Sequence, residues 1–118
     1  MFKPVANFSE ANSELSGISE QIELKTHDLI EAREKYLMAK AFNEKEYSRA
    51  LLETKIRNTE FVQSEIIAQA KLTSYDSRIE LIKAESLYRK LLDEIQALRD
   101  KMDAAKECSY NLRRESQI

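Results

Sequence analysis

The chain has 118 residues, enough for one domain, and its only glycine and only proline, Gly17 and Pro4, lie near the N-terminus. Charged residues make up 34% of it, and the net charge is −2, which excludes a globally basic nucleic-acid-binding protein. No stretch approaches about 18 uncharged apolar residues, so no membrane span is predicted. The single Cys108 excludes an intrachain disulfide and is typical of a reducing, cytoplasmic setting.

The N-terminal residues 1–14 show no clear period, and we predict a flexible arm there. A first helix is predicted over residues 15–57. Its apolar stripe includes an eleven-residue step from Tyr36 to Tyr47, where a strict heptad pattern does not fit. The stripe reads Leu15, Ile18, Ile22, a polar Lys25, Leu29, Ala32, Tyr36, Ala39, Tyr47, Ala50 and Thr54.

A turn is predicted over residues 58–63. Asn58, Thr59 and Ser64 are poor residues in the middle of a helix but good caps, because their side chains compete for backbone hydrogen bonds. Phe61 and Val62 favour extended backbone. Neither glycine nor proline forces a turn here, so one uninterrupted helix of about a hundred residues is the alternative.

A second helix is predicted over residues 64–114, with an apolar stripe whose steps alternate between three and four residues. Ser74 and Ser77 form a layer of small residues in this stripe, and Ile79 and Ile82 widen its apolar face beyond what one partner helix covers. The sequence therefore predicts an all-α fold in which residues 15–118 form a long helical hairpin, or coiled coil, that assembles into a homo-oligomeric bundle or ring. The predicted oligomer interface comprises Ile79, Ile82, Tyr88, Leu91, Ile95, Leu98, Met102 and Leu112.

Signals of catalysis are absent from the sequence. His27 is the only histidine, so one chain cannot form a histidine metal cluster or a Ser/His/Asp set. No glycine-rich phosphate loop is possible with one glycine. Most carboxylates have a basic residue three or four positions away, which is typical of a solvated helix face. We therefore expect a protein that is not an enzyme, with no catalytic residue, metal site or cofactor.

A cluster of cations with one aromatic side chain surrounds the predicted turn. Lysine and arginine neutralise phosphates, and an exposed ring stacks on bases of any identity, so the cluster predicts a single-stranded nucleic-acid contact. The structural alternative is that cations at the end of a helix stabilise its dipole. The cluster comprises Arg49, Lys55, Arg57, Phe61 and Lys71.

This region resembles the UvsY-type recombination mediators of double-stranded DNA phages. The resemblance rests on Lys55-Ile56-Arg57 at the end of a helix, the aromatic Phe61 after it, and a Ser64-Glu65 start. It continues with Tyr88 and with a closing helix that carries Ala105, Lys106, Tyr110 and Leu112. It implies a helical, ring-forming protein, in the host cytoplasm if phage-encoded, that binds single-stranded DNA through Lys55 and Arg57. It also implies that the protein loads a RecA-like recombinase onto strands covered by single-strand-binding protein.

Two functional hypotheses follow from these observations. The first is a non-enzymatic, homo-oligomeric single-stranded-DNA-binding recombination mediator. The second is a structural or adaptor coiled coil that binds only other proteins, and a small helical inhibitor of a host protein is a third, more distant hypothesis. The residues alone do not separate the first two hypotheses, and the resemblance favours the first.

Overall fold

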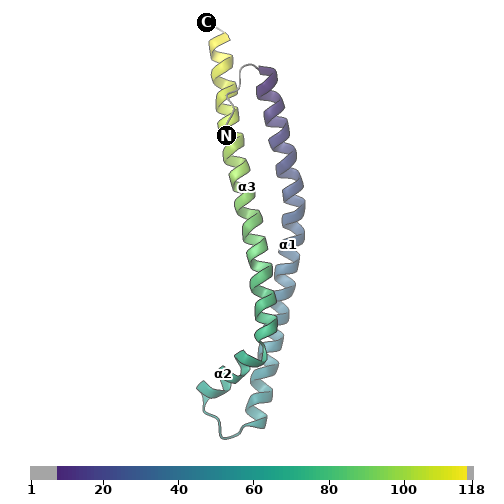
Figure 1. Ribbon diagram of the computed structural model, residues 1–118, viewed down its shortest axis with the longest axis vertical. Helices are drawn as coiled ribbons and strands as arrows, with labels where there is room; N and C mark the ends of the chain where they lie inside the picture. The colour runs from purple at the N-terminus through teal and green to yellow at the C-terminus, as the bar shows by residue number, and fades with distance from the viewer. Residues whose placement is uncertain (1–7, 117–118) are drawn as a thin grey trace. The chain divides into compact units, whose positions relative to one another are not determined.

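The computed structural model describes residues 8–116, and they form three helices (Figure 1). Helix α1 spans Phe8–Arg57, α2 spans Gln63–Thr73 and α3 spans Tyr75–Ser116. The predicted all-α fold is thus confirmed for the described residues, which contain no strand. They divide into two compact units. Unit 1 combines the described residues up to Leu29 with those from Lys90 onward, and unit 2 is Ile30–Arg89.

Helix α1 begins earlier than predicted from the sequence. Residues 8–14 belong to its first turns rather than to an arm, and residues 1–7 of the predicted arm lie outside the described residues. Glu10 lies in the first turn, where a carboxylate stabilises the helix dipole. Apolar periodicity does not reveal this start, because a segment can be helical without such a period when nothing in it breaks the helix. The helix ends at Arg57, the predicted position.

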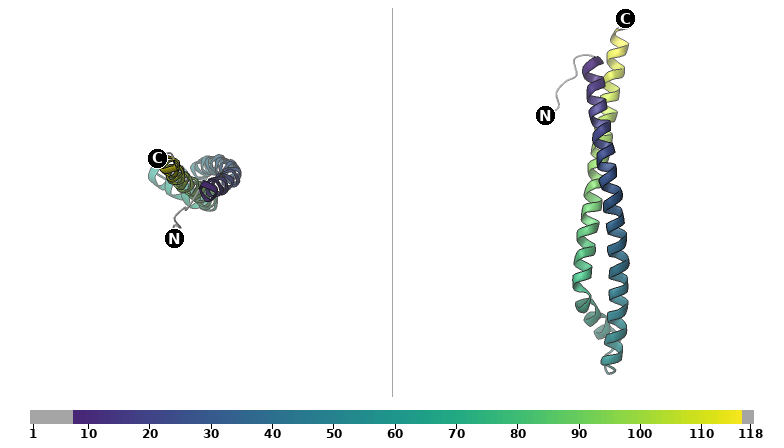
Figure 2. Two further views of the ribbon diagram at one scale, coloured as in Figure 1. Left: turned by 90° about the horizontal axis from the view of Figure 1, so that it is seen from above. Right: turned by 90° about the vertical axis from the view of Figure 1, so that its right-hand side faces the viewer.

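The chain reverses in unit 2 through a short turn after α1. Asn58 closes α1 with two hydrogen bonds to the Thr54 carbonyl, one from its backbone N–H (3.0 Å) and one from its side-chain Nδ2 (3.3 Å). Val62, in extended backbone, is the N-cap of α2 and offers no side-chain hydrogen bond. Ser64, which the sequence suggested as a cap, lies instead within the first turn of α2. Figures 1 and 2 show α2 beside the last turns of α1 in more than one view.

The predicted second helix over residues 64–114 is in fact two helices, separated at Ser74. This residue has φ −95° and ψ 15°, and its hydroxyl donates to the Ala70 carbonyl at 2.8 Å. A serine hydroxyl bound to the carbonyl four residues earlier competes with the helix ladder and bends it. On the α3 side of the bend, the Ser77 hydroxyl lies 2.9 Å from the Ser74 carbonyl.

Unit 1 packs its helices with aliphatic side chains. Ile18 of α1 and Leu91, Ile95 and Ala105 of α3 are buried. The polar Lys25 in the stripe of α1 has a partner across the helices, because its Nζ lies 2.5 Å from Glu94 Oε2. This interaction holds the pKa of the Glu94 carboxyl below its usual range, against the opposing effect of partial burial.

Unit 2 packs its helices mainly with small and polar side chains. Its buried residues are Ala32, Ala50, Thr54, Ile66, Ala70, Ser74 and Ser77. Tyr36 of α1 and Tyr88 of α3 add a stacked ring pair with centroids 5.6 Å apart. Asn43, which fills the eleven-residue step in the stripe of α1, lies with its Oδ1 3.0 Å from the Ser77 hydroxyl.

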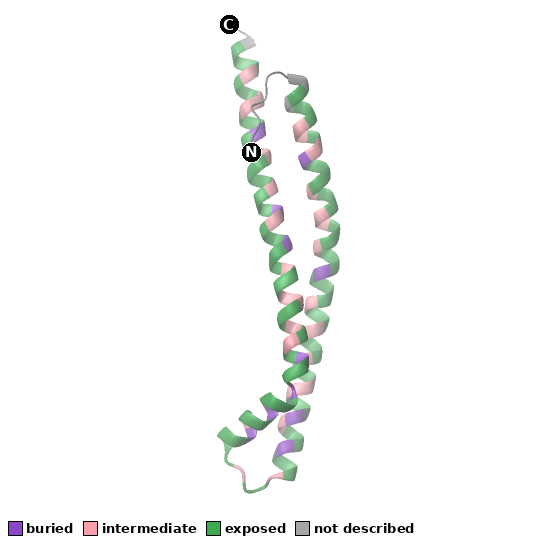
Figure 3. Cartoon of the chain, in the orientation of Figure 1, coloured by how far each residue is buried: buried purple, intermediate pink, exposed green. Residues whose placement is uncertain are grey.

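Exposed residues predominate along all three helices (Figure 3), and the large apolar side chains among them lie chiefly in unit 2. No large side chain among the described residues is completely buried. Among the residues whose burial the structure describes, three large apolar or aromatic residues are exposed in unit 1 and eleven in unit 2. The three are Leu24, Leu92 and Tyr110. The eleven are Ile30, Leu37, Met38, Phe42, Leu52, Ile56, Val62, Leu72, Tyr75, Ile82 and Leu87.

Candidate nucleic-acid interface

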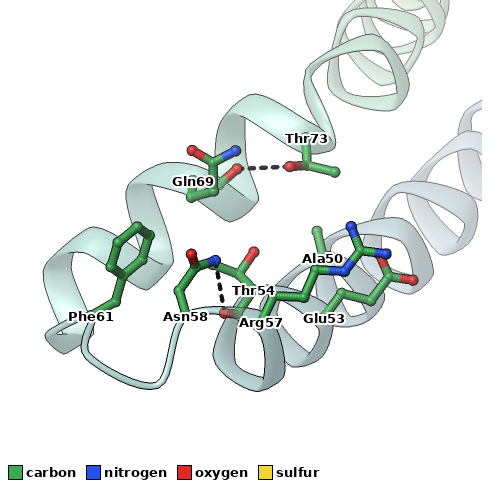
Figure 4. Close-up of a pocket in the computed structure, with 8 residues that line it drawn as sticks. All are labelled: Ala50, Glu53, Thr54, Arg57, Asn58, Phe61, Gln69 and Thr73. Carbon is green, nitrogen blue, oxygen red and sulfur yellow. Dashed lines mark hydrogen bonds between the residues drawn. The ribbon is translucent and has the colours of Figure 1, made fainter.

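A groove of about 340 Å³ lies at the chain reversal of unit 2, and we call it the reversal groove. Side chains from α1, from the turn and from α2 line it (Figure 4). The lining residues are Ala50, Glu53, Thr54, Arg57, Asn58, Phe61, Gln69 and Thr73. The groove thus brings together a cation, a carboxylate, an aromatic ring and several hydrogen-bonding groups.

Arg57 and Phe61 of the predicted cluster share this groove. Figure 4 shows their side chains on either side of Asn58, with Arg57 extending back along α1 beside Glu53. Within residues 8–116, no carboxylate lies within ion-pair distance of Arg57, although Glu53 stands four residues before it. Phe61 is half-buried, and its backbone N–H donates to the Asn58 carbonyl at 3.0 Å, which holds the ring at the groove.

Lys55 lies on a different side of α1. Residues two positions apart in a helix are separated by about 200° around its axis, so Lys55 and Arg57 do not face the same way. Lys55 instead lines a second groove, of about 300 Å³, which we call the Lys55 groove. Its lining residues are Ser48, Leu51, Leu52, Lys55, Gln63 and Ile66. One ligand chain therefore cannot contact both cations of the Lys-x-Arg motif within one groove.

The other two cations of the cluster stand apart. Arg49 is exposed on α1, with its Nη1 3.8 Å from Glu46 Oε1. Lys71 is exposed on α2 and lines neither groove. Residues 49–73 carry four cations and three carboxylates, so this end of unit 2 has a net charge of only +1. Binding of phosphates here would depend on individual side chains rather than on a strong field.

The stripe predicted as the oligomer interface is partly covered within the chain. Leu91 and Ile95 are buried and Ile82 is exposed. The other five residues, Ile79, Tyr88, Leu98, Met102 and Leu112, are half-buried. The exposed apolar side chains available to a second chain lie mainly elsewhere, on faces outside the predicted interface.

Three polar residues that line the reversal groove or form contacts between helices were not predicted to do so from the sequence. Glu53 lines the reversal groove, Asn43 contacts Ser77, and Glu94 pairs with Lys25. Asn43 and Lys25 are polar residues inside an apolar stripe, and this position predicts a polar partner for each across the helix pair, here Ser77 and Glu94. Glu53 carried the signal of an i,i+4 spacing to Arg57.

The chain matches no family model, no curated protein and no solved structure. Among residues 8–116, no group of three histidine, cysteine or acidic side chains is placed to hold a metal ion. None of the helices in this range combines the length and apolarity needed to cross a membrane. Function must therefore be inferred from the side chains at the chain reversal and from the exposed faces of unit 2.

Proposed function

We propose that the chain is a non-enzymatic helical protein that binds single-stranded DNA at the reversal groove and works as an oligomer. The observation that carries this proposal is that Arg57 and Phe61 line the same groove. Among the described residues, no ion pair engages the Arg57 guanidinium. A guanidinium binds phosphate oxygens in a bidentate manner, and a ring beside it stacks on an unpaired base. Duplex DNA offers no unstacked base to Phe61, so single strands are favoured.

The carboxylate of Glu53 should oppose the binding of phosphate in this groove. Its carboxylate lies beside Arg57 (Figure 4), where it repels phosphate and attracts the guanidinium. Removing the Glu53 charge should therefore strengthen binding, whereas removing Arg57 should weaken it. The weak net charge of one groove means that several copies must act together for useful affinity, as in an oligomer.

The test is fluorescence anisotropy of labelled oligo-dT at about 50 mM salt. Arg57→Ala and Phe61→Ala should weaken binding, and Arg57→Ala should flatten the salt slope by about 0.7 for each phosphate that is no longer neutralised. Glu53→Gln should tighten binding. Lys101→Ala, at an exposed position of unit 1, is the matched control and should leave binding unchanged. Lys55→Ala should have a smaller effect than Arg57→Ala, because Lys55 faces another groove.

Two outcomes contradict the proposal. One is the absence of wild-type binding to oligo-dT at tens of micromolar protein. The other is equal weakening by Arg57→Ala and Lys101→Ala, which would mean that binding reflects net charge alone. A role in loading a RecA-like recombinase is implied only by the resemblance. It would be tested by strand-exchange assays with strands covered by single-strand-binding protein.

The second candidate function is an adaptor that binds only other proteins. The eleven exposed apolar residues of unit 2 favour it, since such side chains are anchors for protein partners. Both functions use an assembled protein, and the oligo-dT measurement separates them. An adaptor would assemble without any binding to DNA.

A further inference from the structure

Two stripes of side chains run along the part of α1 that belongs to unit 2. In each stripe, residues recur at alternating steps of three and four, the spacing that keeps a helix face toward a parallel or antiparallel partner. The basic stripe is Lys35, Met38, Phe42, Lys45, Arg49 and Leu52. The acidic stripe is Glu34, Leu37, Ala41, Glu44, Ser48 and Leu51. All of these side chains are exposed except Leu51, which is half-buried.

The two stripes match each other position by position. Each residue of the basic stripe follows one residue of the acidic stripe, so two parallel α1 helices in register bring them together in pairs. Lys45 then meets Glu44 of the neighbouring copy, and Lys35 meets Glu34. Phe42 meets the small Ala41, and Leu52 meets Leu51. Within residues 8–116, neither Glu44 nor Lys45 forms an ion pair in its own chain, so both charges are available.

The Lys55 groove lies at the end of the acidic stripe. Ser48 and Leu51 of that stripe line the groove together with Ile66 of α2. The groove is a recess with both apolar and polar lining, including the chain's own Leu52, and Leu52 of a parallel neighbour would arrive beside it. Packing of a side chain into a hole between residues of a facing surface is the usual geometry of such helix pairs.

Symmetry decides which stripes can meet in a closed assembly. A rotation axis of three-fold or higher order parallel to α1 relates parallel copies, and it lets the basic stripe of one copy lie against the acidic stripe of the next. A two-fold axis perpendicular to α1 relates antiparallel copies, and it places each stripe against itself. In the antiparallel arrangement the basic stripe meets a stripe that contains no carboxylate, so Lys45 and Arg49 lack the opposite charges that the parallel arrangement supplies.

We propose that copies of this chain associate through unit 2 with their α1 helices parallel and the basic stripe of one copy on the acidic stripe of the next. The inference gives an interface to the oligomer in the proposed function and rests on that part of it alone. It moves the interface from the stripe of α3 to two faces of α1. It also gathers the chain reversals of all copies at one end of the contact.

A charge-swap series on the full chain tests the interface without DNA. Lys45→Glu and Glu44→Lys should each raise the dissociation constant by about tenfold or more, because each places like charges in contact. The double variant Glu44→Lys/Lys45→Glu should assemble like the wild type. Lys101→Glu, exposed in unit 1, is the control and should not change the mass. Sedimentation equilibrium gives the masses, and circular dichroism verifies that every variant stays helical.

Orientation is tested by oxidative cross-linking. In a Cys108→Ser background, the Ala41→Cys/Phe42→Cys variant should form disulfides between chains, since these positions meet in the parallel register. An assembled protein that does not cross-link there overturns the parallel arrangement. A wild type that is monomeric at concentrations on the order of 100 μM, or a double swap that fails to restore the mass, overturns the interface. Loss of mass in Lys45→Glu but not in Arg57→Ala would separate this interface from DNA binding.

Discussion

Units 1 and 2 use opposite kinds of side chains to hold their helices together. Unit 1 buries Ile18, Leu91 and Ile95, whereas unit 2 buries mostly alanine, serine and threonine. A small residue buries little apolar area, so a buried alanine or serine of unit 2 contributes less than a buried isoleucine or leucine of unit 1. Eleven large apolar or aromatic residues of unit 2 are instead exposed, against three in the described part of unit 1.

Units 1 and 2 therefore differ both in how their helices pack and in which side chains they leave exposed. Aliphatic side chains pack between the helices of unit 1. The small-residue packing of unit 2 lets its helices approach closely and accompanies a larger number of exposed apolar side chains. The reversal groove and the Lys55 groove are in unit 2 as well. Sequence composition alone does not show the division, because each helix of the pair contributes to both units.

Truncating an aliphatic residue of unit 1 should have the largest effect on stability. Ile95 is 3% exposed, and Ile95→Ala should lower the free energy of unfolding by about 2–5 kcal/mol, because transfer energy is forfeited and a cavity is left behind. Ile82→Ala, at a position 49% exposed in unit 2, is the control. Urea unfolding at low protein concentration measures both. Equal effects of the two variants would contradict the contrast between the units.

Enlarging a small residue of unit 2 should come next. Ala70 of α2 is fully buried, and Ala70→Leu should cost about 1–3 kcal/mol of unfolding free energy, because the close packing has no room for a larger side chain. Ala68→Leu is on the same helix at an exposed position and should be almost neutral. If both variants are equally stable by urea unfolding, the packing of unit 2 around Ala70 is loose rather than close.

Removing the buried hydroxyl beside the bend should have a smaller effect. Ser77→Ala deletes the contacts of this hydroxyl with Asn43 and with the Ser74 carbonyl, and it should cost about 1 kcal/mol. Ser86→Ala, at an exposed position of α3, is the matched control. Thermal unfolding followed by circular dichroism compares the two, and a neutral Ser77→Ala would mean that the bend does not need this hydroxyl.

The Lys25–Glu94 pair should give unit 1 a small dependence of stability on pH. The pKa of Glu94 is lowered in the folded chain, so its contribution is complete above the carboxyl's unfolded pKa and is lost as pH falls through the folded pKa. Glu94→Gln should therefore lower the thermal midpoint slightly at neutral pH and match the wild type at strongly acidic pH. If the difference in thermal midpoint between Glu94→Gln and the wild type persists at strongly acidic pH, its cause is packing rather than charge.

The sequence predicted the features that depend on apolar periodicity. The helical class, the end of α1 at Arg57, and the small-residue layer of Ser74 and Ser77 were all predicted from spacing and residue type. The bend at Ser74 was not, because a serine in a regular stripe fits a continuous helix as well as a broken one. Its outcome depends on hydrogen bonds with Ala70 and Ser77 that spacing does not show.

The candidate site was harder to predict than the fold. A linear motif grouped Lys55 with Arg57, although helix geometry alone places residues two positions apart on different sides. Phe61 follows a turn, and turns have no period from which to infer a neighbour. The stripe of α3 was predicted as an oligomer interface because the sequence does not say whether an apolar face is covered by its own chain or by another. In the middle of the stripe, Leu91 and Ile95 are covered by their own chain.

In the proposed oligomer, unit 2 rather than unit 1 associates with other copies, and two matched substitutions test this directly. Leu52 in unit 2 and Leu24 in unit 1 lie on the same helix and are almost equally exposed, at 61% and 63%. Light scattering on Leu52→Asp and Leu24→Asp at the same concentration compares the units with fold and exposure held constant. We predict that Leu52→Asp dissociates the oligomer and that Leu24→Asp keeps the wild-type mass. Equal masses for the two variants, or dissociation by Leu24→Asp alone, would contradict it.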